Sequence, residues 1–368
     1  MPLGVYIHIP FCAHRCDYCD FATWTDRAHL IDDYVDACVT DLKQRHTAGL
    51  LPEANTVFFG GGTPSLLDSS AIQKIIDVIP IANDAEVTVE CNPDSADASK
   101  LAAYARAGVN RLSFGVQSMV PDVLGALGRT HNPDNVERSV AWARDAGITA
   151  INLDLIYGSS CESIDDWKYT VDATLALRPD HISAYALTVE PGTPLGRAVA
   201  DGSQTGTDDD AQADMYLLAD DLLTEAGLDW YEISNWSEAG SECRHNLGYW
   251  NGSDYLAIGC AAHGYTQGRR WWNVRTPERY IEAIRNGTSP EAGSEHLEAV
   301  AARDESQALM LRTSTGIPHD PAVDLVANDL ADDGLLSSIE GHWILTRRGR
   351  LLGSEVITRL AIGRVECQ

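Results

Sequence analysis

Strand-like and helix-like segments alternate regularly through the first half of this 368-residue chain. Short runs rich in β-branched and aromatic residues occupy positions 4–10, 56–60, 86–92, 111–117, 150–157 and 181–187. Between them lie segments whose apolar residues recur every three or four positions, namely 29–46, 69–79, 97–107, 132–146 and 163–178. This alternation predicts βα units and a parallel sheet.

Six such strands, with no sign of a seventh and eighth unit of the same kind, favour an incomplete (β/α)6 barrel over a closed eightfold one. An open flat sheet is the alternative. In either case chemistry belongs at the carboxyl ends of the strands. The polar or glycine-rich positions that fall there are Cys12, Gly60 to Thr63, Glu90, Gln117 and Asp154.

The regular alternation of strand-like and helix-like segments ends at about residue 200. Residues 208–227 are predicted to form a helix, followed by a strand-like WYEISNW and a Trp-, Gly- and Asn-rich stretch, predicted to be irregular, up to about 275. The tail has helical patterns at 304–312 and 321–333, a hairpin-like LLSSIEGHWILT and a last helix, the order of a winged-helix-like unit. We expect a partial barrel at 1–200, an α/β extension at 201–298 and a small winged-helix-like domain at 299–368.

Composition excludes several classes of protein. A net charge of -27, from 54 acidic and 27 basic residues, disfavours a nucleic-acid surface, because phosphate neutralisation needs basic patches. No segment approaches the roughly 20 apolar residues of a membrane span, and MPLGVYIHIPF lacks the features of a secretory signal. Nine cysteines are too sparse for a disulfide scaffold, so a reducing cytoplasm is expected.

Three of these cysteines, Cys12, Cys16 and Cys19, form a C-x3-C-x2-C run directly after the first predicted strand. One short loop of this kind can place three thiolates on three irons of a 4Fe-4S cubane and leave the fourth iron open to a small molecule. Zinc is the alternative, with His14 completing a set of four. However, zinc usually takes paired C-x2-C units from two places.

The cysteine run and a later glycine run resemble those of a known family. The run YIHIPFCxxxCxYC, followed by FFGGGTPS, is similar to the HemN-type branch of the radical-SAM superfamily over nearly the whole chain. The resemblance implies a 4Fe-4S cluster on the three cysteines, with S-adenosylmethionine (SAM) chelated at the open iron. It also implies a set of SAM contacts, at Tyr6, Tyr18, Gly61, Gly62, Thr63, Glu90, Gln117, Arg129, Asp154 and Ala186.

Two features separate subfamilies of this branch. The porphyrinogen-oxidising members carry a further cysteine two places after the third, where this chain has Phe21. The run CRHNLGYWNG contains the H-N-x-x-Y-W motif of the heme-chaperone relatives called HemW. By that resemblance His245, Asn246, Tyr249 and Trp250 are heme-binding candidates: an imidazole can ligate heme iron, and flat aromatic rings suit a porphyrin.

The same motif has a plainer interpretation, since a histidine beside two aromatic residues is more often a packing residue. Cys243 could add a thiolate, although Cys-x-His is not the usual heme-attachment pattern, and His263 is a candidate second heme contact or an ordinary loop histidine. Two stretches depart from the family pattern. YGSSCES replaces a Gly-Leu-Pro-Gly turn, and IGCAAHG (258–264) replaces a more glycine-rich run.

The resemblance therefore implies a heme chaperone that binds heme and a SAM-ligated 4Fe-4S cluster and delivers heme to an acceptor heme protein, respiratory or other. Heme binding should weaken in His245→Ala. The alternatives are a radical-SAM enzyme, either a coproporphyrinogen III dehydrogenase-like oxidase or a methyltransferase, and a structural zinc protein. No nucleic-acid partner is expected. Peripheral membrane contact is compatible with an acceptor, nothing in the residues encodes an anchor, and the oligomeric state is left open.

Overall fold

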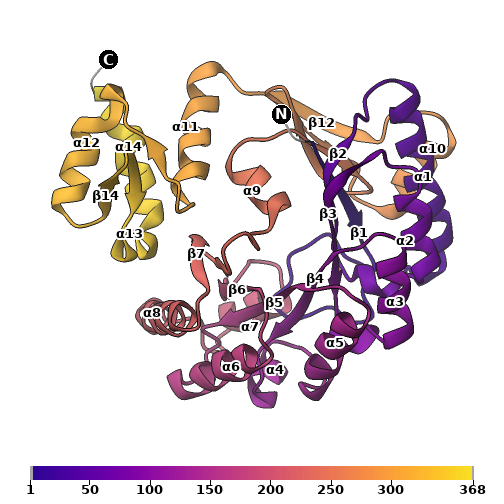
Figure 1. The fold of residues 1–368 in the computed structure, drawn as a ribbon, viewed down its shortest axis with the longest axis horizontal. Helices are drawn as coiled ribbons and strands as arrows, with labels where there is room; N and C mark the ends of the chain where they lie inside the picture. The colour runs from indigo at the N-terminus through magenta and orange to yellow at the C-terminus, as the bar shows by residue number, and fades with distance from the viewer. Residues whose placement is uncertain (1–2, 367–368) are drawn as a thin grey trace.

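The fold is that of a computed structural model, which describes residues 3–366 and is built around one large curved sheet (Figure 1). Six parallel strands lie side by side in chain order within this sheet. They are β1 (Gly4–Ile9), β2 (Ala54–Gly61), β3 (Ile81–Cys91), β4 (Arg111–Gln117), β5 (Ala150–Tyr157) and β6 (His181–Ala186). The predicted incomplete barrel is therefore confirmed, with strand positions close to those expected.

Helices follow the strands and cover the outer face of the sheet (Figure 1). They are α1 (Ile31–Thr47), α2 (Ser69–Ile76), α3 (Ala98–Arg106), α5 (Asp134–Asp145) and α6 (Ile164–Ala176). Two shorter helices, α4 (Pro121–Ala126) and α7 (Pro194–Ala200), pack instead in a small separate apolar cluster with Tyr18 and Ile156. Side chains of a strand alternate between the two faces. Outward residues such as Ile7, Phe59, Val89, Leu112 and Leu153 are fully buried in the main apolar core. The inward set is polar or aromatic and lines the barrel interior.

The sheet continues past both edges of the barrel. β9 (Tyr255–Ile258) lies parallel beside β1 and is followed outward by antiparallel β10 (His263–Thr266), β11 (Arg269–Asn273) and β12 (Glu291–His296). At the other edge, β8 (Asn235–Ser237) and β7 (Asp229–Glu232) pair antiparallel beyond β6. β9 is a seventh parallel strand that the sequence did not predict, because four residues are too few to reveal a period. The extension also carries α8 (Asp209–Glu225) and α10 (Pro277–Arg285).

The run WYEISNW, expected as one strand, is a tight hairpin of β7 and β8. No glycine or proline marks the turn. Instead, the buried carboxylate of Glu232 accepts hydrogen bonds from the Ser234 amide at 3.0 Å and from Asn235 Nδ2 at 2.6 Å. A side chain thus satisfies the turn's polar groups, which composition alone does not reveal.

The stretch up to 275 was expected to be irregular, and this expectation is wrong. The H-N-x-x-Y-W motif lies on a short helix, α9 (Arg244–Trp250), and β9 to β11 follow it. Glycines make room for the large rings of β11: a side chain at Gly264 would overlap Trp271, and one at Gly293 would come within 2.6 Å of Trp272. Cross-strand Trp–Gly packing of this kind replaces the apolar alternation that usually identifies a strand.

The last part of the chain forms a small unit seen at one side of the molecule in Figure 1. Its elements are α11 (Ala299–Leu311), β13 (Ile317–Pro318), α12 (Pro321–Asp332), β14 (Leu336–Ile339), β15 (His342–Leu345), α13 (Arg347–Leu351) and α14 (Gly353–Glu366). The three strands form their own antiparallel sheet, and residues such as Val323, Leu330 and Trp343 form a separate apolar core. The three-part division of the chain stays a prediction, with this separate core in its favour. Of the helices in residues 3–366, none is long and apolar enough to cross a bilayer.

Candidate functional site

The three predicted cluster ligands lie on the loop that leaves β1. Cys12, Cys16 and Cys19 are each half-buried and carry free thiols. The Cys12 amide donates to the Trp24 carbonyl at 3.0 Å, and the Asp17 amide donates to the Leu127 carbonyl at 3.2 Å, which ties the loop to two other segments. The loop is therefore held in place while its sulfurs remain partly accessible.

A partly buried cation faces these sulfurs. Arg129 donates through Nη1 to Cys16 Sγ at 3.5 Å and through Nη2 to the Gly115 carbonyl at 2.7 Å. Burial raises the pKa of the Cys12 and Cys19 thiols, so an apo site favours protonated sulfur. Three clustered cysteines beside a fixed guanidinium fit the thiolate donor set of an iron–sulfur cluster. Among residues 3–366, no three His, Cys, Asp or Glu side chains are arranged around a single metal ion.

The glycine run at the end of β2 packs directly against the cysteine loop. A side chain at Gly62 would lie 3.1 Å from Cys12 Sγ and 2.7 Å from the Phe11 carbonyl oxygen, and Thr63 Oγ1 lies 3.6 Å from Cys12 Sγ. Gly61 has a φ of 110°, and a side chain there would overlap the His8 ring. Glycine is required here both by backbone conformation and by close approach.

We expect Gly61→Ala to lower the free energy of unfolding by about 1–3 kcal/mol more than Gly108→Ala, because overpacking adds to backbone strain. Gly108 is a matched control: its φ is 96°, yet open space surrounds it. Urea unfolding of the two variants and the wild type measures the difference. Equal losses in both variants would contradict close packing at His8.

Glu90 lies near the end of β3 and accepts a hydrogen bond from the Gly61 amide at 3.1 Å. Burial, and then the negative charge of Asp154, raises the pKa of Glu90 to about 8. A carboxyl group that is costly to ionise is a good partner for a ligand cation, because an ammonium group would restore its charge. Glu90 therefore fits its predicted role as a SAM contact.

The raised pKa makes stability depend on pH. Between about pH 4.5 and pH 8 the folded chain keeps the Glu90 proton that the unfolded chain releases, so Glu90 lowers stability increasingly as pH rises through this window. We expect Glu90→Gln, measured without SAM, to gain stability relative to the wild type at pH 8 and to gain less at pH 5. Denaturant unfolding at both values checks this. A difference that does not change with pH would contradict it.

Asp154 lies deeper in the barrel and already has protein partners. Its carboxylate accepts from Ser113 Oγ at 2.6 Å and from Asn152 Nδ2 at 2.8 Å, although burial still raises its pKa. Asn152 Oδ1 in turn meets His181 Nδ1 at 2.6 Å, and His181 Nε2 meets the Tyr231 hydroxyl at 2.7 Å. Asp154 is thus one end of a buried hydrogen-bonded network that crosses the interior.

The remaining predicted SAM residues form two groups and an outlier. Tyr18 packs near Arg129 beside the cysteines, and Gln117 ends β4 with a φ of 63°, a strained conformation of the kind found at functional sites. Tyr6, together with Gly61 and Glu90, lines a partly open cavity. Ala186 is exposed at the carboxyl end of β6.

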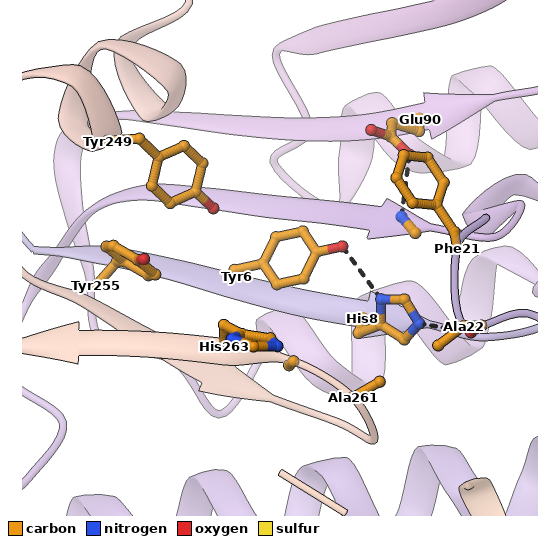
Figure 2. Close-up of a pocket in the computed structure, with 11 residues that line it drawn as sticks. Tyr6, His8, Phe21, Ala22, Glu90, Tyr249, Tyr255, Ala261 and His263 are labelled. Atoms are coloured by element: carbon orange, nitrogen blue, oxygen red, sulfur yellow. Dashed lines mark hydrogen bonds between the residues drawn. The ribbon is translucent and has the colours of Figure 1, made fainter. Parts of the chain in front are cut away.

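The cavity has a volume of about 330 Å³ and is walled largely by aromatic rings (Figure 2). The rings belong to Tyr6 on β1, Phe21 after the cysteine loop, Tyr249 on α9 and Tyr255 on β9. The other lining residues are His8, Ala22, Gly61, Glu90, Ala261, Ala262 and His263. It is thus an apolar, flat-walled space that adjoins the predicted SAM contacts.

The predicted heme residue His245 does not line this cavity. It is buried and stacks on Phe58 with ring centroids 5.1 Å apart. Its Nδ1 lies 2.8 Å from Thr56 Oγ1 and its Nε2 lies 2.8 Å from the Tyr249 hydroxyl, while burial lowers its pKa to about 3. Axial ligation through His245 would require one of these hydrogen bonds to break.

A second cavity of about 270 Å³ lies on the other side of Tyr249, at the amino ends of β1 and β2. Its lining includes Gly4, Thr56, Arg244 and His245. Tyr249 and Tyr255 line both cavities. The tyrosine of the H-N-x-x-Y-W motif therefore reaches the aromatic cavity, whereas its histidine faces the second one.

Sequence reasoning missed the group that fixes α9. Glu86 on β3 is buried and accepts from the His245 amide at 3.1 Å through Oε1 and from the Arg244 amide at 3.2 Å through Oε2. Its Oε2 also lies 3.8 Å from Nη1 of the buried Arg111. The signal was present in the strand period, since Glu86, Thr88 and Glu90 alternate on the inward face.

The other two motif residues on α9 are Trp250 and Asn246. Trp250 is covered by Arg312, whose guanidinium carbon lies 4.8 Å from the ring centroid, a cation–π contact. Arg312 also donates to Glu232 Oε1 at 2.7 Å and 3.0 Å. Asn246 is half-buried. Trp250 thus joins the motif to Arg312, which follows α11 in the C-terminal unit. Figure 1 shows α9 near α11.

The two segments that depart from the family pattern keep unusual backbone geometry. Ala261 has a φ of 56°, in the left-handed region that glycine adopts without strain, and it lines the aromatic cavity. Gly158 has a φ of 89°, and its amide donates to Glu162 Oε2 at 2.8 Å. Both turns are therefore formed, the first at the cost of a strained alanine.

The chain is similar to known proteins in both sequence and fold. The family model of the radical SAM superfamily matches residues 6–173. The chain is 42% identical to "Heme chaperone HemW" of Mycobacterium tuberculosis (strain CDC 1551 / Oshkosh), over 98% of this chain and 95% of that protein. It is 35% identical to "Heme chaperone HemW" of Bacillus subtilis (strain 168), over 96% and 97%, and 35% identical to that of Escherichia coli (strain K12), over 95% and 96%.

A solved structure has the same fold. Coproporphyrinogen III oxidase (HemN) from Escherichia coli, described as a radical SAM enzyme, matches with a TM-score of 0.85 at 22% identity, covering 98% of this chain and 90% of that one. This match extends through the barrel, the extension and the C-terminal unit.

Proposed function

The chain belongs to the HemW family of the radical SAM superfamily, and from this premise we propose that it binds heme beside a SAM-ligated 4Fe-4S cluster and delivers the heme to an acceptor heme protein. The observation that carries this proposal is the aromatic cavity, which adjoins both the cysteine loop and the predicted SAM contacts. An apolar, flat-walled cavity with a few polar groups is the kind of site that a porphyrin fits.

Cys12, Cys16 and Cys19 would hold the cluster, and when bound it would supply one-electron chemistry to SAM. Arg129 places a positive charge against the Cys16 sulfur. Gly61 and Gly62 keep the chain close to the loop, and Glu90 offers a carboxylate to the ammonium group of SAM. Tyr6, Tyr18, Thr63, Gln117, Asp154 and Ala186 are proposed as the other SAM contacts.

In this proposal the H-N-x-x-Y-W motif acts mainly through Tyr249. The tyrosine ring forms part of the cavity wall, and its hydroxyl is held at 2.8 Å by His245 Nε2. Trp250, under Arg312, keeps α9 in position against the C-terminal unit, and Asn246 on the same helix is kept as a proposed heme contact. His245→Ala would then weaken heme binding by releasing the Tyr249 ring, even without an iron–nitrogen bond from His245.

The proposed compartment is the reducing cytoplasm, since all eight cysteines in residues 3–366 carry free thiols. The proposed partners are heme, SAM and an acceptor heme protein, respiratory or other. The marked acidity of the chain supports a protein acceptor rather than a nucleic acid.

The enzyme alternative is less well supported, because Phe21 occupies the position at which the porphyrinogen-oxidising relatives carry a further cysteine. Its ring lines the aromatic cavity and is 67% exposed, so it presents an apolar surface there instead of a thiol. An apolar ring at the cavity suits retention of a flat ligand better than its oxidation.

Anaerobic reconstitution followed by hemin titration tests the proposal. We expect one heme per chain, its passage to an apo-heme protein, and no conversion of coproporphyrinogen III. Absorbance of the heme band follows the first two, and product analysis by chromatography follows the third. Coproporphyrinogen conversion with 5'-deoxyadenosine formed in step would contradict the chaperone proposal and favour the enzyme.

A further inference from the structure

Two histidines line the aromatic cavity, and they differ in what their ring nitrogens contact. His8 is buried, with Nε2 3.0 Å from the Ala22 carbonyl oxygen and Nδ1 3.2 Å from the Tyr6 hydroxyl. His263 is exposed, and within the described chain neither of its ring nitrogens has a hydrogen-bond partner. His263 is therefore the cavity histidine whose nitrogens are available to a ligand.

The ring of His263 is oriented by its neighbours without being capped by them. His263 starts β10 opposite Trp272 on β11, and the two rings stack with centroids 6.0 Å apart and planes 27° apart. In Figure 2 the imidazole lies below the Tyr6 ring, between Tyr255 and Ala261. A stacked ring with unoccupied nitrogens is already placed to form an iron bond, so little ordering entropy opposes ligation.

The backbone that carries His263 is also strained. Ala261, two positions before the histidine, holds a φ of 56°, in the left-handed region that is strained for a residue with a side chain. Strain of this kind persists where surrounding structure imposes it and is concentrated at binding sites. The turn brings Ala261, Ala262 and His263 to the cavity together.

A flat ligand would meet two exposed lining residues at this cavity, Phe21 and His263; the other lining residues are half-buried or buried. Phe21 supplies an apolar ring, and His263 supplies a neutral nitrogen donor of the type that ligates heme iron. These two groups come from segments far apart in the sequence, the cysteine loop and β10.

We infer that His263, rather than His245, is the axial ligand to heme iron, with the porphyrin held in the aromatic cavity against Phe21. This inference rests on the proposed function and specifies its site. The step is simple coordination: a bond forms between one imidazole nitrogen of His263 and the iron, with no change in oxidation state. A single ligand at an open cavity suits a heme that must later be released.

Hemin titration of the full-length, cluster-reconstituted protein tests the inference. In His263→Ala we expect affinity to fall at least about tenfold, the scale on which even outer partners of metal ligands act. We also expect the ferric heme band to lose its histidine-ligated form, and added imidazole to restore it. His263→Gln should behave like His263→Ala. His296→Ala, which changes an exposed histidine on β12, is the matched control and should bind as the wild type does.

Iron content and the cluster absorbance check that the variants fold. An unchanged heme spectrum and affinity in His263→Ala would overturn the inference while leaving the proposed function intact, most clearly if His245→Ala then lost the histidine-ligated spectrum. Failure of the wild type to bind hemin would instead overturn the proposed function, and the inference with it.

Discussion

Replacing Cys12, Cys16 and Cys19 by alanine together is expected to remove essentially all cluster iron, at least about tenfold relative to the wild type, and to abolish SAM binding. The three thiols share one loop whose ends are fixed by hydrogen bonds to Trp24 and Leu127, and Arg129 faces them. Three measurements under anaerobic conditions check this: iron and sulfide content, the visible absorbance of the iron–sulfur cluster, and SAM binding.

The control is Cys161→Ala, since Cys161 is an exposed free thiol outside the loop and should leave iron content unchanged. The variants also separate iron from zinc. Zinc in place of iron in the anaerobically purified wild type, lost on the triple substitution, would contradict the cluster and support the structural zinc alternative. A third outcome, wild-type iron content in the triple variant, would place the cluster elsewhere.

Glu86→Ala is expected to lower the free energy of unfolding by about 3–5 kcal/mol, the usual cost of breaking a buried ion pair by removing one partner. Glu86 accepts hydrogen bonds from the Arg244 and His245 amides and lies beside Arg111, which is only 3% exposed. Without the carboxylate, the buried Arg111 loses its ion-pair partner and α9 loses its amino-terminal acceptor. Urea unfolding followed by circular dichroism measures the loss.

Two variants calibrate this result. Glu86→Gln keeps an oxygen acceptor for the α9 amides without the charge, so its loss should be intermediate. Glu53→Ala changes an exposed glutamate and should stay within about 0.5 kcal/mol of the wild type. If Glu86→Ala were as mild as Glu53→Ala, the carboxylate would not be what holds α9 in place.

The barrel could be predicted from the sequence because two independent signals identify each strand. Each is a compact apolar or β-branched run, as in 150–157, and each is followed by a helix with a clear three-to-four-residue period. Strands of a parallel sheet are largely covered on both faces, so each appears in the sequence as a nearly continuous apolar run. The predicted and observed bounds of β4 and β5 coincide.

The extension could not be predicted in the same way, since long-range contacts determine it. The turn between β7 and β8 depends on the Glu232 carboxylate, and α9 depends on Glu86, some 158 residues away from Arg244. Similarly β10 and β11 pair a tryptophan over a glycine, which gives no regular alternation. Local pattern contains no information about such partners.

For the candidate site, the structure brings together several of the residues that the sequence singled out. The cysteine loop, the glycine run and Glu90 lie together as expected at the carboxyl ends of neighbouring strands. What the sequence could not provide was the hydrogen bonding of His245, whose partners Thr56 and Tyr249 come from β2 and from its own helix. Whether an imidazole is occupied depends on three-dimensional neighbours.

Tyr249 and Tyr255 line both cavities, and the Tyr249 hydroxyl lies 2.8 Å from His245 Nε2. A shift of the Tyr249 ring that enlarges one cavity makes the other cavity smaller. Any molecule that fills one compartment and pushes the ring therefore alters the affinity of the opposite compartment for its own occupant, and the reverse effect must be equal in free energy. A ligand that moved the Tyr249 ring in one cavity would therefore link the occupancies of the two cavities thermodynamically.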